Sequence, residues 1–189
     1  MIRFTIRPIL IVIFILSVSF APALHAHLLP KQRGTLNFVD NGAYMVLSLP
    51  VSVFIDFDDN ENGLLSMTEF NKHRPAITSR IRAGIVLNEN GDDRFLQGLM
   101  FSPVGEDEHN TSVIAPISRV YVMGKFILDS SNSELIFSND LYGDQASERV
   151  FKMSAKRKAD RQKQVFELSP SASKKILFGE KASSKVAAN

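Results

Sequence analysis

The chain has 189 residues, of which 44% are hydrophobic and 22% charged, and its formal net charge is +2. It contains no cysteine, which excludes disulfides, thiolate metal sites, thiol catalysis and a lipoprotein anchor. Stability must therefore come from packing. The length is sufficient for one ordinary domain with its own hydrophobic core.

The amino terminus has the layout of a secretory signal peptide. Two basic residues, Arg3 and Arg7, precede an apolar run from Ile9 to Val18, and small residues follow. This run is shorter than the roughly 18 apolar residues that a bilayer span requires, and no later stretch approaches that length. We therefore expect a periplasmic or secreted protein with no membrane span in the mature chain.

Two cleavage positions would leave a small residue at the cut, after Ala23 or after Ala26. We favour Ala26, so that residues 1–26 form the signal peptide and the mature chain begins at His27. An uncleaved anchor is the alternative, and the flanking residues fit it less well.

Charge is unevenly distributed along the predicted mature chain. Residues 27–148 contain 9 basic and 17 acidic residues, whereas residues 149–189 contain 11 basic and 3 acidic ones. Such asymmetry can indicate a polyanionic partner. The basic residues are spread among turn-like and strand-like segments without an aromatic stacking pattern, so we do not expect nucleic-acid binding.

The first elements of the predicted domain are two strands of a hairpin. Thr35–Val39 and Ala43–Leu49 are apolar-rich, and residues 40–42, Asp-Asn-Gly, have the composition of a hairpin turn. Pro50 suits the first turn of a short helix whose apolar side comprises Val53, Phe54 and Phe57.

A second helical segment follows an acidic loop. Phe70, Ile77 and Ile81 recur at helical spacing, and Pro75 is expected to kink or divide the segment, which ends near Gly84.

The residues after this helical segment are predicted to form mainly β-structure. Residues 85–87 and 95–101 form a second predicted hairpin around the turn-like residues 88–93, and a polar loop covers 103–111. Four further segments are strand-like in their β-branched and aromatic content: 120–128, 134–138, 149–155 and 164–168. The tripeptide 156–158, Lys-Arg-Lys, is predicted to mark a turn. Short strands at this spacing favour a β-sandwich.

The acidic loop has the strongest chemical signal in the chain. From Asp58 to Glu69 it reads Asp-Asp-Asn-Glu-Asn-Gly-Leu-Leu-Ser-Met-Thr-Glu. Calcium prefers six to eight oxygen ligands, which these side chains can supply, and Gly63 lies where the chain must turn sharply. The segment resembles an EF-hand loop, and the resemblance extends over residues 50–82.

The resemblance implies a set of calcium ligands. They are the side chains of Asp58, Asn60 and Asn62, the backbone carbonyl of Leu64, Ser66 directly or through water, and both carboxylate oxygens of Glu69. Only the first and last are charged, so we expect weak binding, in the range of roughly 10⁻⁵ to 10⁻³ M.

EF-hands normally pair through the eighth loop position, here Leu65, and no second loop is evident. Residues 88–93 lack a late glutamate and have Asp93 where glycine would be needed, so we interpret them as a turn. The lone hand must then bury its apolar side against the β-rich remainder or against another copy of the chain, and we favour the former.

These patterns predict an α+β fold that is mainly antiparallel β and sandwich-like, with one inserted EF-hand helix-loop-helix. We expect one β-rich domain over 27–178, the EF-hand insertion at about 50–83, and a disordered tail over 179–189.

The expected function is that of an exported calcium-binding module, in which Ca²⁺ is a structural or weak sensor ion and an unidentified protein partner is possible. We expect no enzyme, because motifs of serine hydrolases, zinc proteases and phosphate-binding loops do not occur. The alternative is a copper-handling protein that uses the α-amine and imidazole of His27. That site would need a second imidazole, from His73 or His109.

Overall fold

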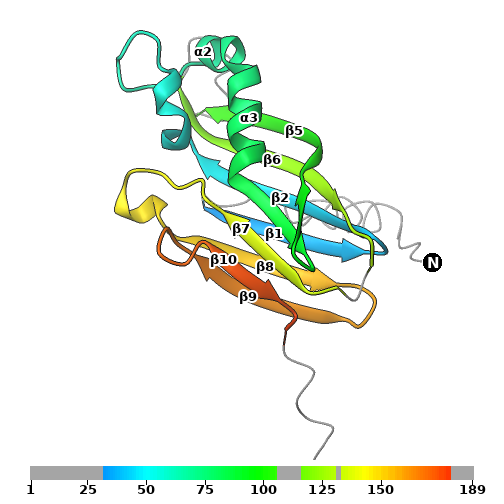
Figure 1. The fold of residues 1–189 in the computed structure, drawn as a ribbon. Coiled ribbons are helices and arrows are strands. Elements are labelled where there is room, and N and C mark those ends of the chain that lie inside the picture. The colour runs from blue at the N-terminus through cyan, green and yellow to red at the C-terminus, as the bar shows by residue number, and fades with distance from the viewer. Residues whose placement is uncertain (1–31, 106–115, 131–132, 180–189) are drawn as a thin grey trace, which may run out of the picture.

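The computed structural model describes residues 32–105, 116–130 and 133–179. The described residues form a mainly β protein with two sheets and a few short helices (Figure 1). The predicted signal peptide and residues 180–189 of the predicted tail lie outside these ranges. None of the helices within them is long and apolar enough to cross a bilayer.

The larger sheet has six strands in the order β5-β6-β2-β1-β8-β9. Their bounds are β1 (Arg33–Val39), β2 (Gly42–Pro50), β5 (Gln97–Gly105), β6 (Ile117–Ile127), β8 (Phe151–Arg157) and β9 (Gln162–Leu168). The neighbours β1 and β8 run parallel, whereas the other neighbouring pairs described are antiparallel. The sheet is therefore mixed, although antiparallel pairing dominates as predicted.

The smaller sheet has four strands in the order β10-β7-β3-β4, all antiparallel. They are β3 (Ile85–Glu89), β4 (Asp92–Phe95), β7 (Leu135–Asn139) and β10 (Lys174–Leu177). The interpretation of 88–93 as a turn is confirmed in outline, because β3 and β4 form a hairpin around Asn90 and Gly91.

Four short helices complete the described residues: the 3₁₀-helices η1 (Val51–Phe57) and η2 (Ala146–Glu148), and the α-helices α2 (Met67–Lys72) and α3 (Arg74–Gly84). Pro75 lies at the start of α3, where a missing amide proton is tolerated, so the predicted division and the predicted end near Gly84 are both confirmed. The predicted start of the first helix needs a correction. Pro50 has extended backbone angles and ends β2, and η1 begins at Val51.

Apolar residues from both sheets and from α3 share one core. In Figure 1 the four-stranded sheet and α3 lie over the same face of the six-stranded sheet. The largest fully buried side chains include five phenylalanines, Phe54, Phe70, Phe126, Phe137 and Phe151. Ile77 and Ile81 of α3 are also fully buried, so the helical face predicted from their spacing packs on the β-structure.

The predicted strand over residues 95–101 is wrong in one respect, because it belongs to two sheets. β4 ends at Phe95, and β5 begins at Gln97 in the other sheet. The pairing of β5 with β6 shifts register between Gln97 and Met100, where Gly98 has a φ of +57°. Glycine tolerates this conformation, which allows β5 to bulge just after the chain has passed from one sheet to the other at Leu96.

Two other predictions at the carboxyl end need correction. Lys156 and Arg157 belong to β8, so the tripeptide 156–158 enters the turn only at Lys158. The sequence also did not predict β10. Only Leu177 of its four residues is buried, so the segment lacks the apolar alternation by which strands are recognised.

A buried carboxylate joins the smaller sheet to the loop that follows β6. Glu89 is 1% exposed and accepts hydrogen bonds from Arg94 Nε (2.9 Å), the amides of Asp129 (2.9 Å) and Ser130 (3.0 Å), and Ser133 Oγ (2.6 Å). Burial opposes ionisation, but these bonds and the charge of Arg94 outweigh it and lower the pKa of Glu89. The ionised form is thus the one that stabilises the fold.

We predict that Glu89→Gln lowers the free energy of unfolding at pH 7 by about 3 kcal/mol, because it breaks a buried charged network. Since the folded pKa of Glu89 is lowered, this contribution is present above its ordinary value of 4.5 and is lost as the pH falls through the folded pKa. Urea unfolding at pH 7 and pH 3 measures both effects. Asp129→Asn is the control, because that carboxylate also pairs with Arg94 but is 75% exposed and should contribute less than about 1 kcal/mol. Equal losses for the two variants would contradict the prediction.

Candidate metal centre

The acidic loop connects η1 to α2 and lies beside α2 in Figure 1. Asp58 directly follows η1, and Glu69 lies in the first turn of α2. The first and last of the predicted ligands are therefore held by the ends of two helical segments.

Side-chain oxygens close this loop on its own backbone. The amide of Gly63 donates to Asp58 Oδ2 (2.7 Å), the amide of Asn62 to Asn60 Oδ1 (3.1 Å), and the amide of Leu64 to Asn62 Oδ1 (2.8 Å). Asp and Asn favour such local bonds to the backbone two or more residues ahead. These hydrogen bonds from backbone amides to the alternating polar side chains therefore hold the chain in a compact bend.

The predicted sharp turn is present at Gly63, whose φ is +79°. No described heavy atom lies within 4 Å of the place where a Cβ would stand, so the backbone angle, and not lack of space, favours glycine here. Glu61 also has a positive φ, of 55°, which is uncommon for a residue with a side chain.

One buried carboxylate oxygen in the loop has no hydrogen-bond partner among the described residues. Asp58 Oδ1 is buried and unpartnered among the described residues, although Oδ2 of the same side chain accepts from Gly63. Leaving a buried charged acceptor unsatisfied is costly, and such atoms in a folded protein call for an explanation. A cation within the loop would supply one.

The carboxylate of Glu69, 6% exposed, caps the helix that follows the loop. It accepts from the amide of Ser66 (2.9 Å), the hydroxyl of Ser66 (2.7 Å) and the amide of Asp59 (3.2 Å). In return, the amide of Glu69 donates to Ser66 Oγ (3.3 Å), which completes a capping box. These bonds, led by those from Ser66, lower the pKa of Glu69 despite its burial.

The donor set suits a hard cation. Within the described ranges, no group of three or more His, Cys, Asp and Glu side chains is placed to hold a metal ion. The loop instead offers two carboxylates together with amide, hydroxyl and carbonyl oxygens. Calcium accepts such mixed oxygen ligands, whereas zinc and copper prefer nitrogen and sulfur.

Leu65, the eighth residue of the loop, attaches it to the larger sheet. Its side chain is fully buried in the same core as Phe54 and Phe70, and its carbonyl accepts a hydrogen bond from the amide of Ile117 in β6 (2.9 Å). An isolated antiparallel bridge joins Ser66 to Pro116. The apolar side of the segment thus packs on the β-rich part of the same chain, as we favoured from the sequence.

Side chains of α2, of α3 and of His73 between them pair with acidic residues in and beside the loop. Asp59 bonds Lys72 Nζ (2.7 Å) and His73 Nε2 (2.8 Å), which lowers the pKa of Asp59. Asp56 pairs with Arg80 at 2.9 Å. Sequence reasoning did not identify these partners, because the pairs are 13 to 24 residues apart. They reduce the repulsion that the loop's ligands experience from nearby carboxylates.

The histidines of the copper alternative are only partly described. His73 stacks on Phe57, with ring centroids 5.2 Å apart, and contacts Asp59. His27 and His109 lie outside the described residues, so the proposed pairing with His27 stays a prediction.

No protein-family model matches this chain, and no curated protein is similar to it in sequence. The resemblance of residues 58–69 to an EF-hand loop therefore depends on the residues of the loop themselves.

Removing the Ser66 hydroxyl should weaken the loop and raise the pKa of Glu69 toward its ordinary value of 4.5. We expect Ser66→Ala to lower the free energy of unfolding at pH 7 by about 1 kcal/mol, as is usual for a lost helix cap. The lowered pKa stabilises the fold above pH 4.5, and this contribution is lost as the pH falls through the folded value. The loss in the variant should therefore shrink in acid.

A carbon-detected NMR titration of Glu69 in calcium-free protein, combined with urea unfolding, measures both quantities. Ser66→Thr retains the hydroxyl and is the matched control. A Glu69 pKa that is identical in the alanine variant and the parent would contradict the assignment.

Proposed function

We propose that this chain is a calcium-binding protein whose residues 58–69 form one EF-hand loop. The observation that carries the proposal is the buried, unpartnered Asp58 Oδ1 in a bend that its neighbours' side chains already close. An anionic oxygen held in this way is suited to a cation.

The proposed ligands are those expected from the resemblance. Asp58 and Glu69 supply the negative charge, whereas Asn60, Asn62, Ser66 and the carbonyl of Leu64 supply neutral oxygens. Because only two ligands are charged, the affinity is weak, with a dissociation constant of roughly 10⁻⁵ to 10⁻³ M. Such an affinity suits an exported protein, which meets more calcium than a cytosolic one.

Glu69 has a double role in this proposal. Its carboxylate accepts hydrogen bonds from Ser66 and Asp59 in the described structure. Binding the ion through both carboxylate oxygens requires some of these bonds to be exchanged. Calcium therefore competes with the helix cap, which further limits the affinity.

Calcium here is a structural or weak sensor ion in a binding or accessory module, and not the cofactor of an enzyme. The ion would fix η1 relative to α2, and Leu65 connects that geometry to β6. We further infer that the two sheets form a β-sandwich in which η1, the loop, α2 and α3 are the inserted EF-hand. The shared apolar core of the two sheets supports this classification.

Calcium at 10 mM should raise the melting temperature of the protein by about 5–10 °C. With a dissociation constant of about 10⁻⁴ M, 10 mM calcium is about 100 times that constant and adds about 2.7 kcal/mol to the free energy of unfolding. At this chain length, each kcal/mol raises the melting temperature by a few degrees. Glu69→Gln should abolish the rise. Differential scanning calorimetry with calcium or a chelator measures it, and isothermal titration calorimetry gives the affinity.

Glu61→Gln is the matched control for this experiment. Glu61 is exposed, lies in the same loop and is not a proposed ligand, so its substitution makes the same change in charge and should retain most of the calcium effect. An unchanged melting temperature in the parent protein, or equal losses in the two variants, would remove the basis of the proposal.

A further inference from the structure

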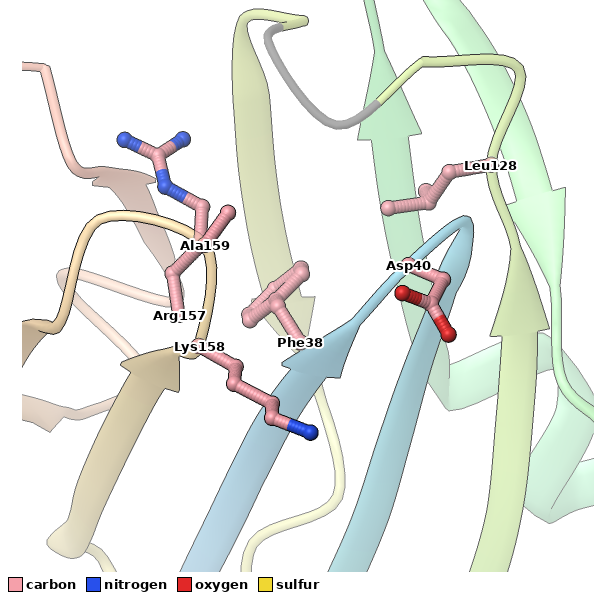
Figure 2. Close-up of a pocket in the computed structure, with 6 residues that line it drawn as sticks. All are labelled: Phe38, Asp40, Leu128, Arg157, Lys158 and Ala159. Carbon is pink, nitrogen blue, oxygen red and sulfur yellow. The ribbon is translucent and has the colours of Figure 1, made fainter.

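Three adjoining hollows surround the end of the β8–β9 hairpin. The first, of about 330 Å³, lies between that hairpin and the β1–β2 turn, and Figure 2 shows Phe38 between Arg157 and Lys158 on one side and Asp40 on the other. The second, of about 310 Å³, shares Phe38, Arg157 and Lys158 with the first. The third, of about 550 Å³, shares Lys163 with the second and extends along β10. We call these three hollows together the basic groove.

Cations dominate the lining of the basic groove. They are Lys156, Arg157, Lys158, Arg161, Lys163 and Lys175. Among the described residues that line it, Asp40 is the acidic one. The basic end that the sequence shows is thus gathered around the end of the β8–β9 hairpin, on both faces of the sheet. This region attracts anions, although Arg157 is already paired with Asp160 of the turn (2.9 Å).

Two of these lysines stand directly opposite each other. Lys156 on β8 and Lys163 on β9 are cross-strand partners, and both are exposed. Directly opposed like charges destabilise an antiparallel pair. The same row of the sheet continues through Asn37 and Tyr44 to Lys125 on β6. An anion lying on this row would relieve a repulsion that the free protein retains.

The inner side of the basic groove, on the face of the sheet opposite Lys156 and Lys163, is already ordered. Phe38 and Phe178 meet edge to face at 5.3 Å, and the guanidinium of Arg157 lies 4.5 Å from the Phe178 ring centre. The Gln164 side chain donates to the carbonyl of Ile176 (3.3 Å) and accepts from the amide of Phe178 (3.0 Å), which connects β9 to the β10 end. A ligand would therefore meet a preformed surface.

The basic groove also adjoins the edges of both sheets. β9 ends the six-stranded sheet and β10 ends the four-stranded sheet, so in the described chain each has a strand neighbour on one side only. Val165 on β9 is 68% exposed, and Ile176 on β10 is 52% exposed. An open strand edge offers backbone hydrogen bonds that an added strand can use. A lipid surface or a polysaccharide has no matching backbone, so these edges favour a peptide.

We propose that the basic groove binds an extended acidic segment of a partner protein, which pairs with the β9 edge and places its carboxylates against Lys156 and Lys163. The positive lining selects the charge of the segment. Because side chains alternate along a strand, carboxylates beside Lys163 place the intervening apolar residues on the opposite face, beside Gln164 and the exposed Ile176. This inference does not depend on calcium binding by residues 58–69.

The test uses a fluorescein-labelled octapeptide of alternating glutamate and valine, with a glutamine–valine peptide as its neutral control. Fluorescence anisotropy on the full mature chain, in a chelator, should show binding of the acidic peptide that weakens as salt increases. Hydrogen exchange should show that the acidic peptide protects amides of β9.

Lys156→Gln/Lys163→Gln should weaken peptide binding at least tenfold without lowering the melting temperature, because the substitution removes an unfavourable pair. Arg82→Gln/Arg149→Gln is the matched control. It makes the same change in net charge at exposed positions that do not line the basic groove, and should leave binding within twofold.

Equal binding by the two double variants would overturn the proposal, since it would reflect net charge alone. Equal binding of the two peptides, or binding without protection of β9, would also overturn it. Binding to vesicles containing 30% phosphatidylserine, but not to the acidic peptide, would assign the basic groove to a lipid surface instead.

Discussion

Leu65 and the start of β6 form the contact on which the candidate metal centre depends. The Leu65 side chain is fully buried, and its carbonyl accepts a hydrogen bond from the amide of Ile117. Because this residue is tied to the sheet, the oxygen-bearing residues before it must bend back within a short span of chain. Glu69, one helical turn later, then faces the loop from the start of α2. A lone loop therefore has the sheet as its support, where paired loops support each other.

The two proposed carboxylate ligands differ in their hydrogen bonding. Glu69 is satisfied by Ser66 and the amide of Asp59, whereas Asp58 retains a buried oxygen without a partner in the described structure. Two nearby carboxylates that are not proposed ligands are paired, Asp59 with Lys72 and His73 and Asp56 with Arg80. Negative charge is thus concentrated at the proposed ligands, and the surrounding field is partly cancelled. This distribution is suitable for a weakly bound divalent cation.

The uneven charge of the sequence becomes two separate surfaces in the fold. The acidic loop lies beside α2, and the basic groove surrounds the β8–β9 hairpin at a different end of the molecule in Figure 1. The parallel pairing of β1 with β8 places the basic carboxyl-terminal strands next to the first hairpin. The aromatic floor formed by Phe38 and Phe178 results from that arrangement, since these residues are far apart in the chain.

Local patterns were sufficient to predict the first hairpin, the helix break at Pro75, its end near Gly84 and the sharp turn at Gly63, because short-range sterics and hydrogen bonds decide them. The spacing of the oxygen donors along twelve residues can likewise be identified from the sequence alone. Contacts between distant segments decide the parallel β1–β8 pair, the change of sheet between β4 and β5, strand β10 and the side-chain partners of Asp56 and Asp59. Only the tertiary structure could decide these, since pairing across a sheet depends on which strands the core brings together, and local periodicity does not encode that choice.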